Sequence, residues 1–155
     1  MVMYIKRTED SALLSRLNQS LHEWHVNLHP ELFFPYDQPS TQVYFENKLA
    51  DDCHMFFIAV EDEEPLGYVW LELRKEKGND FKRPSHYGYI YQIVVKEQHQ
   101  GQGIGAFLMK EAEYVARDYG ADRLELDYLA QNYIAEAFYK KIGYESKRVT
   151  VHKEL

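Results

Sequence analysis

Residues 93–106 read IVVKEQHQGQGIGA, and this stretch decides how the rest of the chain is interpreted. Its apolar start predicts the end of a buried strand, and the glycine-rich turn Gly101–Gly105 precedes an amphipathic helix. Glycines let the backbone approach a ligand closely, because no side chain stands in the way. The first N–H groups of a helix are unpaired, and the helix dipole adds positive potential there. The stretch therefore predicts a cradle for a pyrophosphate.

Three other interpretations of the glycine turn fit less well. A turn without a ligand would cost roughly 0.5–1 kcal/mol for each ordered glycine relative to alanine. Gly101, Gly103 and Ala106 match the G-x-G-x-x-A motif of dinucleotide-binding folds, but that motif directly follows its strand and begins a βαβαβ half. Here residues 96–100 intervene, and the turn lies two-thirds of the way along the chain. A nucleoside-triphosphate loop is excluded, because the chain has no Gly-Lys-Ser or Gly-Lys-Thr.

Apolar periodicity on both sides of the turn predicts alternating strands and helices. Three strands follow one another in the middle of the chain, so the class is α/β with a mixed sheet. A length of 155 residues suits one domain, residues 1–155. Helices are expected from a cap at Thr8 to Leu28, from a cap at Ser40 to Ala50, and over 104–119 and 132–142, and strands over 1–7, 54–61, 66–74, 87–95, 123–129 and 144–152.

The composition excludes several classes of protein. A net charge of -7 argues against a nucleic-acid partner. With Cys53 as the single cysteine, neither an internal disulfide nor a cysteine-based zinc site is expected. The sequence contains no signal-peptide pattern and no apolar stretch of membrane-spanning length, so no membrane partner and a cytoplasmic location are expected. The 13 tyrosines exceed what a core needs, and some should line a cleft.

A second informative segment is NYIAEAFYKKIGY, residues 132–144. At helical spacing, Ile134, Phe138 and Ile142 form one row that we expect to be buried. Ala135 and Tyr139 form the neighbouring row, in which the small residue leaves a slot beside the tyrosine hydroxyl. From these residues alone, Tyr139 reads as a core tyrosine. Asn132 reads as the helix N-cap.

The two segments together resemble the GNAT superfamily of N-acetyltransferases. Gln100, Gly103 and Gly105 meet that family's Arg/Gln-x-x-Gly-x-Gly/Ala fingerprint. Residues 132–144 look like its second motif, Asn-x-x-Ala-x-x-x-Tyr-x-x-x-Gly-Phe/Tyr. The resemblance covers residues 87–151 and reaches the first 50 residues only in the order of the elements. It implies a GNAT-like mixed, largely antiparallel central sheet, flanked by helices and splayed at the central strands.

The resemblance also implies a function, namely acetyl-CoA-dependent N-acetyl transfer to a primary amine by direct attack, with no metal. Tyr139 would be the general acid that protonates the departing thiolate. Lys110, Lys140 and Lys141 are sources of positive charge for the anionic cosubstrate, although each also fits a solvated helix face. The alternative is a non-catalytic acyl-CoA-binding module on the same fold. The implied cosubstrate-binding residues are Ile93, Val94, Val95, Gln100, Gly101, Gln102, Gly103, Ile104, Gly105, Ala106, Asn132, Ala135, Phe138, Tyr139 and Lys141.

The catalytic base is the point where this chain departs from the family pattern. Many family members use a glutamate on the central strand, but residues 87–92 read YGYIYQ and contain no carboxylate. His86, Glu72 on the adjacent strand, or water held by Tyr89 or Tyr91 remain as alternatives. The base is therefore left open by the sequence.

The resemblance implies that the acceptor is a small molecule or a peptide amine, and the net charge gives a weak preference for cations. His22, His25 and His29 lie on one side of the first helix. They fit the edge of the core, a wall of the acceptor pocket or a metal site. The missing His-Glu-x-x-His argues against the metal site, and the core edge is favoured because the histidines flank the apolar face of the helix. A homodimer is compatible with the resemblance but does not follow from the residues. The acceptor-pocket residues are expected to be His29, Phe33, Tyr36, Tyr89 and Tyr91.

Overall fold

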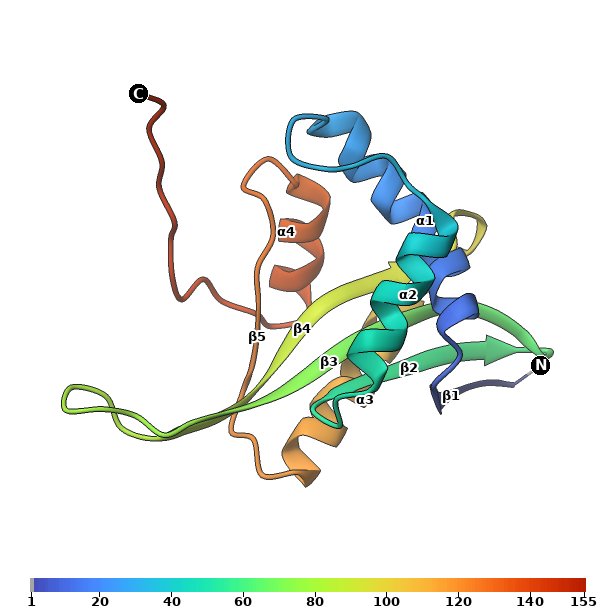
Figure 1. The fold of residues 1–155 in the computed structure, drawn as a ribbon. Helices are drawn as coiled ribbons and strands as arrows, with labels where there is room; N and C mark the ends of the chain where they lie inside the picture. Colours follow the sequence, from blue (N-terminus) through green and yellow to red (C-terminus); the bar gives the residue numbers. More distant parts are fainter. Residues whose placement is uncertain (1) are drawn as a thin grey trace.

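The computed structural model describes residues 2–155 and forms a central sheet with helices on both faces (Figure 1). Within those residues, no helix combines the length and apolar character needed to cross a membrane. A one-turn 3₁₀ helix, Glu97–His99, connects the fourth strand to the glycine turn. The elements, in chain order, are β1 (Met3–Thr8), α1 (Ser11–Leu28), α2 (Gln38–Leu49), β2 (His54–Glu61), β3 (Glu64–Glu76), β4 (Ser85–Val95), α3 (Ile104–Asp118), β5 (Leu124–Leu126) and α4 (Tyr133–Lys141).

The strands follow the spatial order β1-β2-β3-β4-β5. The first four are antiparallel neighbours, whereas β5 runs parallel to β4. Strand β5 pairs with β4 only between Gly88 and Ile90, although β4 continues to Val95 alongside β3. Beyond Ile90 the edge of β4 that faces β5 therefore has no β5 partner. The mixed, largely antiparallel and splayed sheet expected from the sequence is confirmed.

Each face of the sheet carries its own apolar cluster. On one face, α3 packs Leu108 and Ala112 against strand residues such as Val69 and Leu71. On the other face, α1 and α2 cover the aromatic residues of β2 and β3 (Figure 1). There the ring of Phe45 meets the ring of Trp70 edge to face, at 5.9 Å between centroids. Both helical layers thus follow from apolar side chains that alternate along the strands.

The first two helices begin at aspartates rather than at the hydroxyl residues expected from the sequence. The carboxylate of Asp10 accepts the backbone N–H of Leu13 at 3.0 Å, so Asp10 caps α1. Thr8 is instead the last residue of β1. Asp37 caps α2 by accepting the N–H of Ser40 at 3.0 Å. The expected caps were wrong because a nearby carboxylate satisfies the same orphan N–H groups.

The strand expected over residues 144–152 is also wrong. This segment has no regular structure and runs away from the body of the molecule (Figure 1). Val149 and Val151, the apolar residues of its alternating pattern, are 77% and 85% exposed. Lys147 makes one link to the sheet, an ion pair with Glu125 of β5 at 2.8 Å. Alternation makes a segment compatible with a strand, but only a neighbouring strand in register makes it one.

Candidate functional site

The glycine turn is held in a backbone conformation that leaves one side open. Gly101 and Gly103 have φ angles of 78° and 83°, in the left-handed region that favours glycine. A Cβ atom placed on either residue would meet nothing within 4 Å, so the space beside the turn is free. The side-chain amide of Gln100, the residue before the turn, donates a hydrogen bond to the backbone carbonyl of Val95 at 3.2 Å. This bond ties the turn to the end of β4.

The turn leads directly into the N-terminus of α3. Gly103 is the N-cap residue and, as a glycine, supplies no side chain to accept the first helical N–H groups. The carbonyl of Gly103 accepts the N–H of Phe107 at 3.0 Å, which leaves the N–H groups of residues 104–106 without partners inside the helix. Unpaired amides, positive dipole and free space together fit the pyrophosphate of an acyl-CoA.

The three lysines expected to supply positive charge differ in their ion pairing. Lys140 forms an ion pair with Glu136 of the same helix at 2.6 Å. Lys110 and Lys141 are exposed, and no ion pair involves them among residues 2–155. Their charge is therefore the more available to an anionic ligand.

Helix α4 packs against the first turn of α3. A Cβ atom on Gly105 would lie 3.1 Å from the Phe138 ring, so a glycine allows this close approach. Asn132 is the N-cap, and its side-chain oxygen accepts the N–H of Ala135 at 3.0 Å. Phe138 packs on the core, but Ile134 is 81% exposed, which corrects its expected burial. Only two residues of that row reach the core, since α4 lies over the edge of the sheet beside β5 (Figure 1).

Tyr139 points into a group of aromatic side chains and is 8% exposed. Its ring stacks on Tyr128 at 5.8 Å between centroids and meets Phe138 and Tyr144 edge to face. Among residues 2–155 no group hydrogen-bonds its hydroxyl, and the only fully buried polar side-chain atom without a partner is Nε2 of His86. The remaining exposure of Tyr139 therefore includes its hydroxyl.

The environment keeps this hydroxyl protonated. Burial, followed by the negative charge of Asp127, raises the pKa of Tyr139 to about 12. The phenol is neutral at physiological pH and holds a proton that it could donate. Such a group suits the protonation of a basic leaving group.

The other face of β4 carries an aromatic and charged surface. The ring of Tyr91 stacks on that of Trp70 at 4.5 Å and meets that of Tyr89 edge to face at 5.1 Å. The guanidinium of Arg74 lies 4.0 Å from the centre of the Tyr89 ring and donates to the Tyr91 hydroxyl at 2.9 Å. The Tyr89 hydroxyl in turn donates to Asp127, which directly follows β5. Tyr89 thus links the two strands where they begin to separate.

Glu72, one of the expected alternatives for the base, is enclosed by donors. One of its oxygens accepts from Arg74, and the other from the Tyr91 hydroxyl and from Nε2 of His54, both at 3.1 Å. Nδ1 of His54 accepts the indole N–H of Trp70 at 3.0 Å, so its proton is on Nε2. Burial lowers the pKa of His54. Glu72 therefore organises the surface and has little capacity left for a ligand.

His86, another alternative for the base, lies far from the opening. It stands near the start of β4, and its ring is 3.4 Å from the position a Gly120 side chain would occupy. Ile90, where β5 leaves β4, is four residues further along, or about 13 Å at the usual rise of a strand. His86 thus has a packing role at the end of α3.

The histidines of α1 hold the segment that connects it to α2. The ring of His25 stacks on that of Phe33 at 5.1 Å, and Nε2 of His22 donates to the backbone carbonyl of Phe34 at 2.7 Å. The Tyr36 hydroxyl donates to the carbonyl of Ser15 at 2.7 Å.

His29 contacts Glu31 at 3.2 Å. Within the described chain no group of three or more His, Cys, Asp or Glu side chains is arranged to hold a metal ion.

The expected acceptor residues lie on two different parts of the fold. Tyr89 and Tyr91 lie together on β4, whereas His29, Phe33 and Tyr36 belong to the α1–α2 connection.

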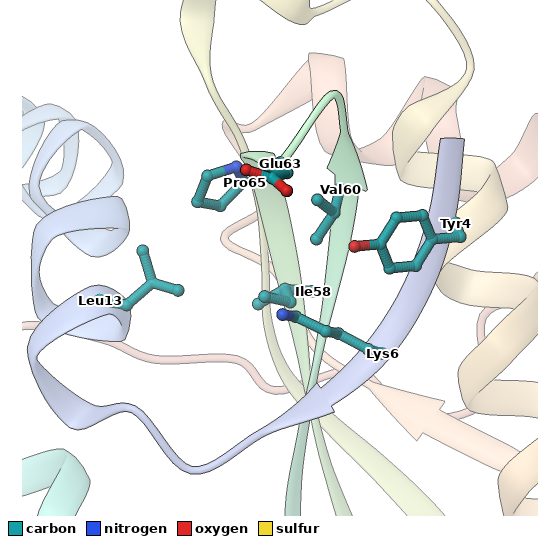
Figure 2. Close-up of a pocket in the computed structure, with 7 residues that line it drawn as sticks. All are labelled: Tyr4, Lys6, Leu13, Ile58, Val60, Glu63 and Pro65. Atoms are coloured by element: carbon teal, nitrogen blue, oxygen red, sulfur yellow. The ribbon is translucent and has the colours of Figure 1, made fainter. Parts of the chain in front are cut away.

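A cavity of about 340 Å³ lies elsewhere, at the β1–β2 edge (Figure 2). Its floor is apolar, and Tyr4, Lys6 and Glu63 reach it from its rim. None of the glycine-turn or α4 residues lines it. The cavity is thus unrelated to the site built by the two motifs.

Two residues of the site were not found from the sequence, namely Asp127 and Arg74. Asp127 looked like part of a strand over 123–129, but β5 ends at Leu126, and the exposed Asp127 that follows it bonds the Tyr89 hydroxyl. The β3–β4 register brings Arg74 to the face that Tyr89 shares. The one sequence signal for Asp127 was a carboxylate close to the end of an expected strand.

Comparisons with known proteins agree with this geometry. The family model described as the acetyltransferase (GNAT) family matches residues 18–144. The N-acetyltransferase YdgE of Bacillus subtilis, described as uncharacterized, is 29% identical over 66% of this chain and 62% of its own. An N-alpha-acetyltransferase of Saccharolobus solfataricus is 27% identical over 68% of this chain and 65% of its own. The chain therefore spans somewhat less than two thirds of the length of the curated relatives it matches.

Solved structures show the same fold. A tetramutant of the BH1408 protein from Bacillus halodurans superposes with a TM-score of 0.89 over the whole of both chains, at 22% identity. The backbone of this chain therefore matches that of the BH1408 protein closely although the two sequences share only 22% of their residues.

Proposed function

Because the chain belongs to the GNAT family of acetyltransferases, we propose that it transfers the acetyl group of acetyl-CoA to a primary amine. The acceptor is a small molecule, with a preference for cations, or a peptide. The observation that carries this proposal is the protonated hydroxyl of Tyr139 on α4, which has no hydrogen-bond partner among residues 2–155 although the residue is only 8% exposed. A tyrosine hydroxyl in a protein core usually bonds a protein group or an ordered water, and the Tyr139 hydroxyl has no protein partner among residues 2–155.

Different residues of the chain would bind the cosubstrate and donate the proton. The open glycine turn and the free N–H groups of α3 would hold the pyrophosphate, with charge from Lys141 and Lys110. The edge of β4 over Ile93–Val95, which lies beyond its pairing with β5, would bond the pantetheine arm. Bound acetyl-CoA supplies a thioester at the opening. Tyr139 would then donate its proton to sulfur as the amine nitrogen bonds the acyl carbon and the C–S bond breaks.

One observation favours a second function, a non-catalytic acyl-CoA-binding module. Strand β4 has no carboxylate, and Glu72 of β3 is already enclosed by Arg74, His54 and Tyr91. Such a module would keep the glycine turn but would have no base for the amine. The accessible Tyr139 hydroxyl argues against it, because a binding module has no use for a proton donor.

The two functions differ in thiol release. The purified chain is mixed with acetyl-CoA and, separately, with spermidine, kanamycin, lysine and a short peptide with a free N-terminal alanine. The peptide is included because one relative is an N-alpha-acetyltransferase. We expect acceptor-dependent release of CoA thiol, with an acetylated amine as the product seen by mass spectrometry. Tight CoA binding by calorimetry with no thiol release above background would support the binding module instead.

A further inference from the structure

The connection between β3 and β4 is a hairpin that extends away from one end of the sheet (Figure 1). The two strands stay paired to the ends of both elements, so residues 77–84 form the hairpin tip. The side-chain oxygen of Asn79 accepts the backbone N–H groups of Phe81 and Lys82, at 2.8 Å and 2.9 Å. The backbone N–H of Asn79 donates to the carbonyl of Lys82 at 2.9 Å. These bonds order the tip, yet Phe81 is 97% exposed.

The hairpin tip is basic, although the chain as a whole has a net charge of -7. Its exposed cations are Lys77, Lys82 and Arg83, and its one carboxylate is that of Asp80. In the described part of the chain no ion pair includes any of these four side chains. The tip thus presents an aromatic ring among unpaired positive charges. Such a surface is complementary to an apolar recess with a negative rim.

The cavity at the β1–β2 edge has an apolar floor of sufficient size (Figure 2). The floor residues are Leu13, Ile58, Val60 and Pro65. The cavity has a volume of about 340 Å³, whereas an apolar cavity of about 150 Å³ is large enough to hold benzene. It therefore has room for the side chain of a phenylalanine.

The rim of this cavity is acidic. Glu63 reaches it from the acidic turn between β2 and β3, residues 61–64, which reads Glu-Asp-Glu-Glu (Figure 2). Glu64 is already ion-paired, but among residues 2–155 no ion pair includes the other three carboxylates of the turn. Lys6 is the one cation of the described chain that lines the cavity, and a lysine can lie over the face of an inserted aromatic ring. The unpaired carboxylates therefore outnumber the cation.

The hairpin tip cannot reach the cavity of its own chain. The acidic turn and the tip lie at opposite ends of β3, whose 13 residues span roughly 40 Å. Figure 1 shows this separation, with the hairpin at the left and the junction of β2 and β3 at the right, beside the N-terminus. A contact between the two surfaces therefore needs two molecules.

We propose that the chain associates head to tail with a second copy of itself, with Phe81 of one molecule in the β1–β2 cavity of the next. Lys82 and Arg83 would pair with the free carboxylates of the acidic turn. Both complementary surfaces are present on every molecule, and they differ from each other, so dimers can extend into longer chains. This inference goes beyond the proposed acetyl transfer and does not depend on it.

Sedimentation equilibrium measures the association. One ring and a few ion pairs form a small contact, so we expect the weight-average mass to rise above that of one chain between about 10 µM and about 1 mM. Phe81→Ala should weaken the association at least about tenfold, as expected for a buried aromatic anchor. Phe34→Ala is the matched control, because Phe34 is also a phenylalanine with an exposed side chain, 89%, and lies on the α1–α2 connection. It should leave the association unchanged.

A second variant, Asp62→Asn with Glu63→Lys, changes the acidic turn. These residues have φ angles of 50° and 62°, and the replacements add no backbone strain, because asparagine tolerates such angles as aspartate does and lysine resembles glutamate in shape. This variant alone should also associate at least about tenfold more weakly. A mixture with Phe81→Ala should form one-to-one dimers and nothing larger, because it contains one intact tip and one intact cavity.

Urea unfolding curves check that each variant keeps its fold. A chain that stays monomeric up to about 1 mM would overturn the proposal and leave both surfaces to other proteins. Equal association of Phe81→Ala and Phe34→Ala would also overturn it. A mixture of the two weakened variants that forms no dimers would do the same, since a contact between identical surfaces predicts that result. No acetyl transfer is measured in these experiments, so their failure would leave the proposed function intact.

Discussion

Tyr139→Phe separates the chemical role of the hydroxyl from the packing role of the ring. The ring contacts Tyr128, Phe138 and Tyr144 at centroid distances of 5.8, 5.0 and 5.9 Å, and phenylalanine keeps all three contacts. The hydroxyl has no partner among residues 2–155, so its removal breaks no hydrogen bond within the described protein. We therefore expect the free energy of unfolding to change by less than about 0.5 kcal/mol, as for substitutions that disturb no buried network.

The effect on turnover should be much larger. A positioned general acid contributes typically 10²–10⁴-fold to a rate, which corresponds to about 3–5 kcal/mol of barrier. Since the pKa of Tyr139 is raised to about 12, the group stays protonated and active through the alkaline range. Turnover of the unaltered chain should accordingly show no loss assignable to Tyr139 up to about pH 10, because a general acid loses function only as the pH approaches its pKa.

The assay is steady-state thiol release at saturating acceptor, together with calorimetric CoA binding and a urea unfolding curve. Tyr144→Phe is the matched control, since its hydroxyl bonds Glu113 at 3.1 Å and is a ring neighbour of Tyr139. The control should lose about 1 kcal/mol of stability, the usual net worth of a hydrogen bond, and keep its turnover. If Tyr139→Phe retains more than half of the turnover, Tyr139 is not the acid. If it loses CoA binding, its role is in binding.

Two further changes probe the cradle and the α1–α2 connection. Gly103→Ala and Gly143→Ala both place a side chain at positive φ with open space around it, so each should cost about 1–2 kcal/mol in a urea unfolding curve. Calorimetry should find CoA affinity lowered at least tenfold only for Gly103→Ala, and equal affinities would remove the glycine turn from the binding site. Burial, with smaller effects of His22 and His29, lowers the pKa of His25 below its ordinary value of 6.5. As the pH falls below about 6.5, the unfolded chain takes up this proton first, so the folded state loses stability. His25→Phe keeps the stack on Phe33 and should reduce the shift of the urea midpoint between pH 7 and 5.5, whereas an unchanged shift would assign the acid sensitivity to other groups.

Local features of the chain were enough to predict the fold and the glycine turn. Strand β2 was predicted with its observed bounds, because a continuous apolar run between polar turns is compatible with little else. Asn132 caps α4, as expected from a residue type that suits a helix N-terminus. These predictions depend on residues close together in sequence, whose preferences are decided by backbone geometry and local hydrogen bonds.

The helix caps were missed locally, because Asp10 and Asp37 stand within three residues of the expected Thr8 and Ser40. The last strand and the base depended on residues far apart in the chain. Residues 144–152 alternate like a strand but have no neighbouring strand to pair with. The sheet ends at β5, which is only three residues long and pairs with β4 alone. The sequence left the base open among Glu72, His86 and water. The tertiary structure places His86 at the wrong end of β4 and surrounds Glu72 with donors.

What the sequence alone determined was the family resemblance, the order of the elements and the identity of Tyr139 as the residue to test. Only the tertiary structure brought Asp127 to Tyr89 across the gap between β4 and β5, a contact between residues 38 positions apart in the chain. Strand pairing and register decide such contacts. A one-residue change in register would turn every side chain of a strand to the other face, and no local pattern records the register of two distant strands.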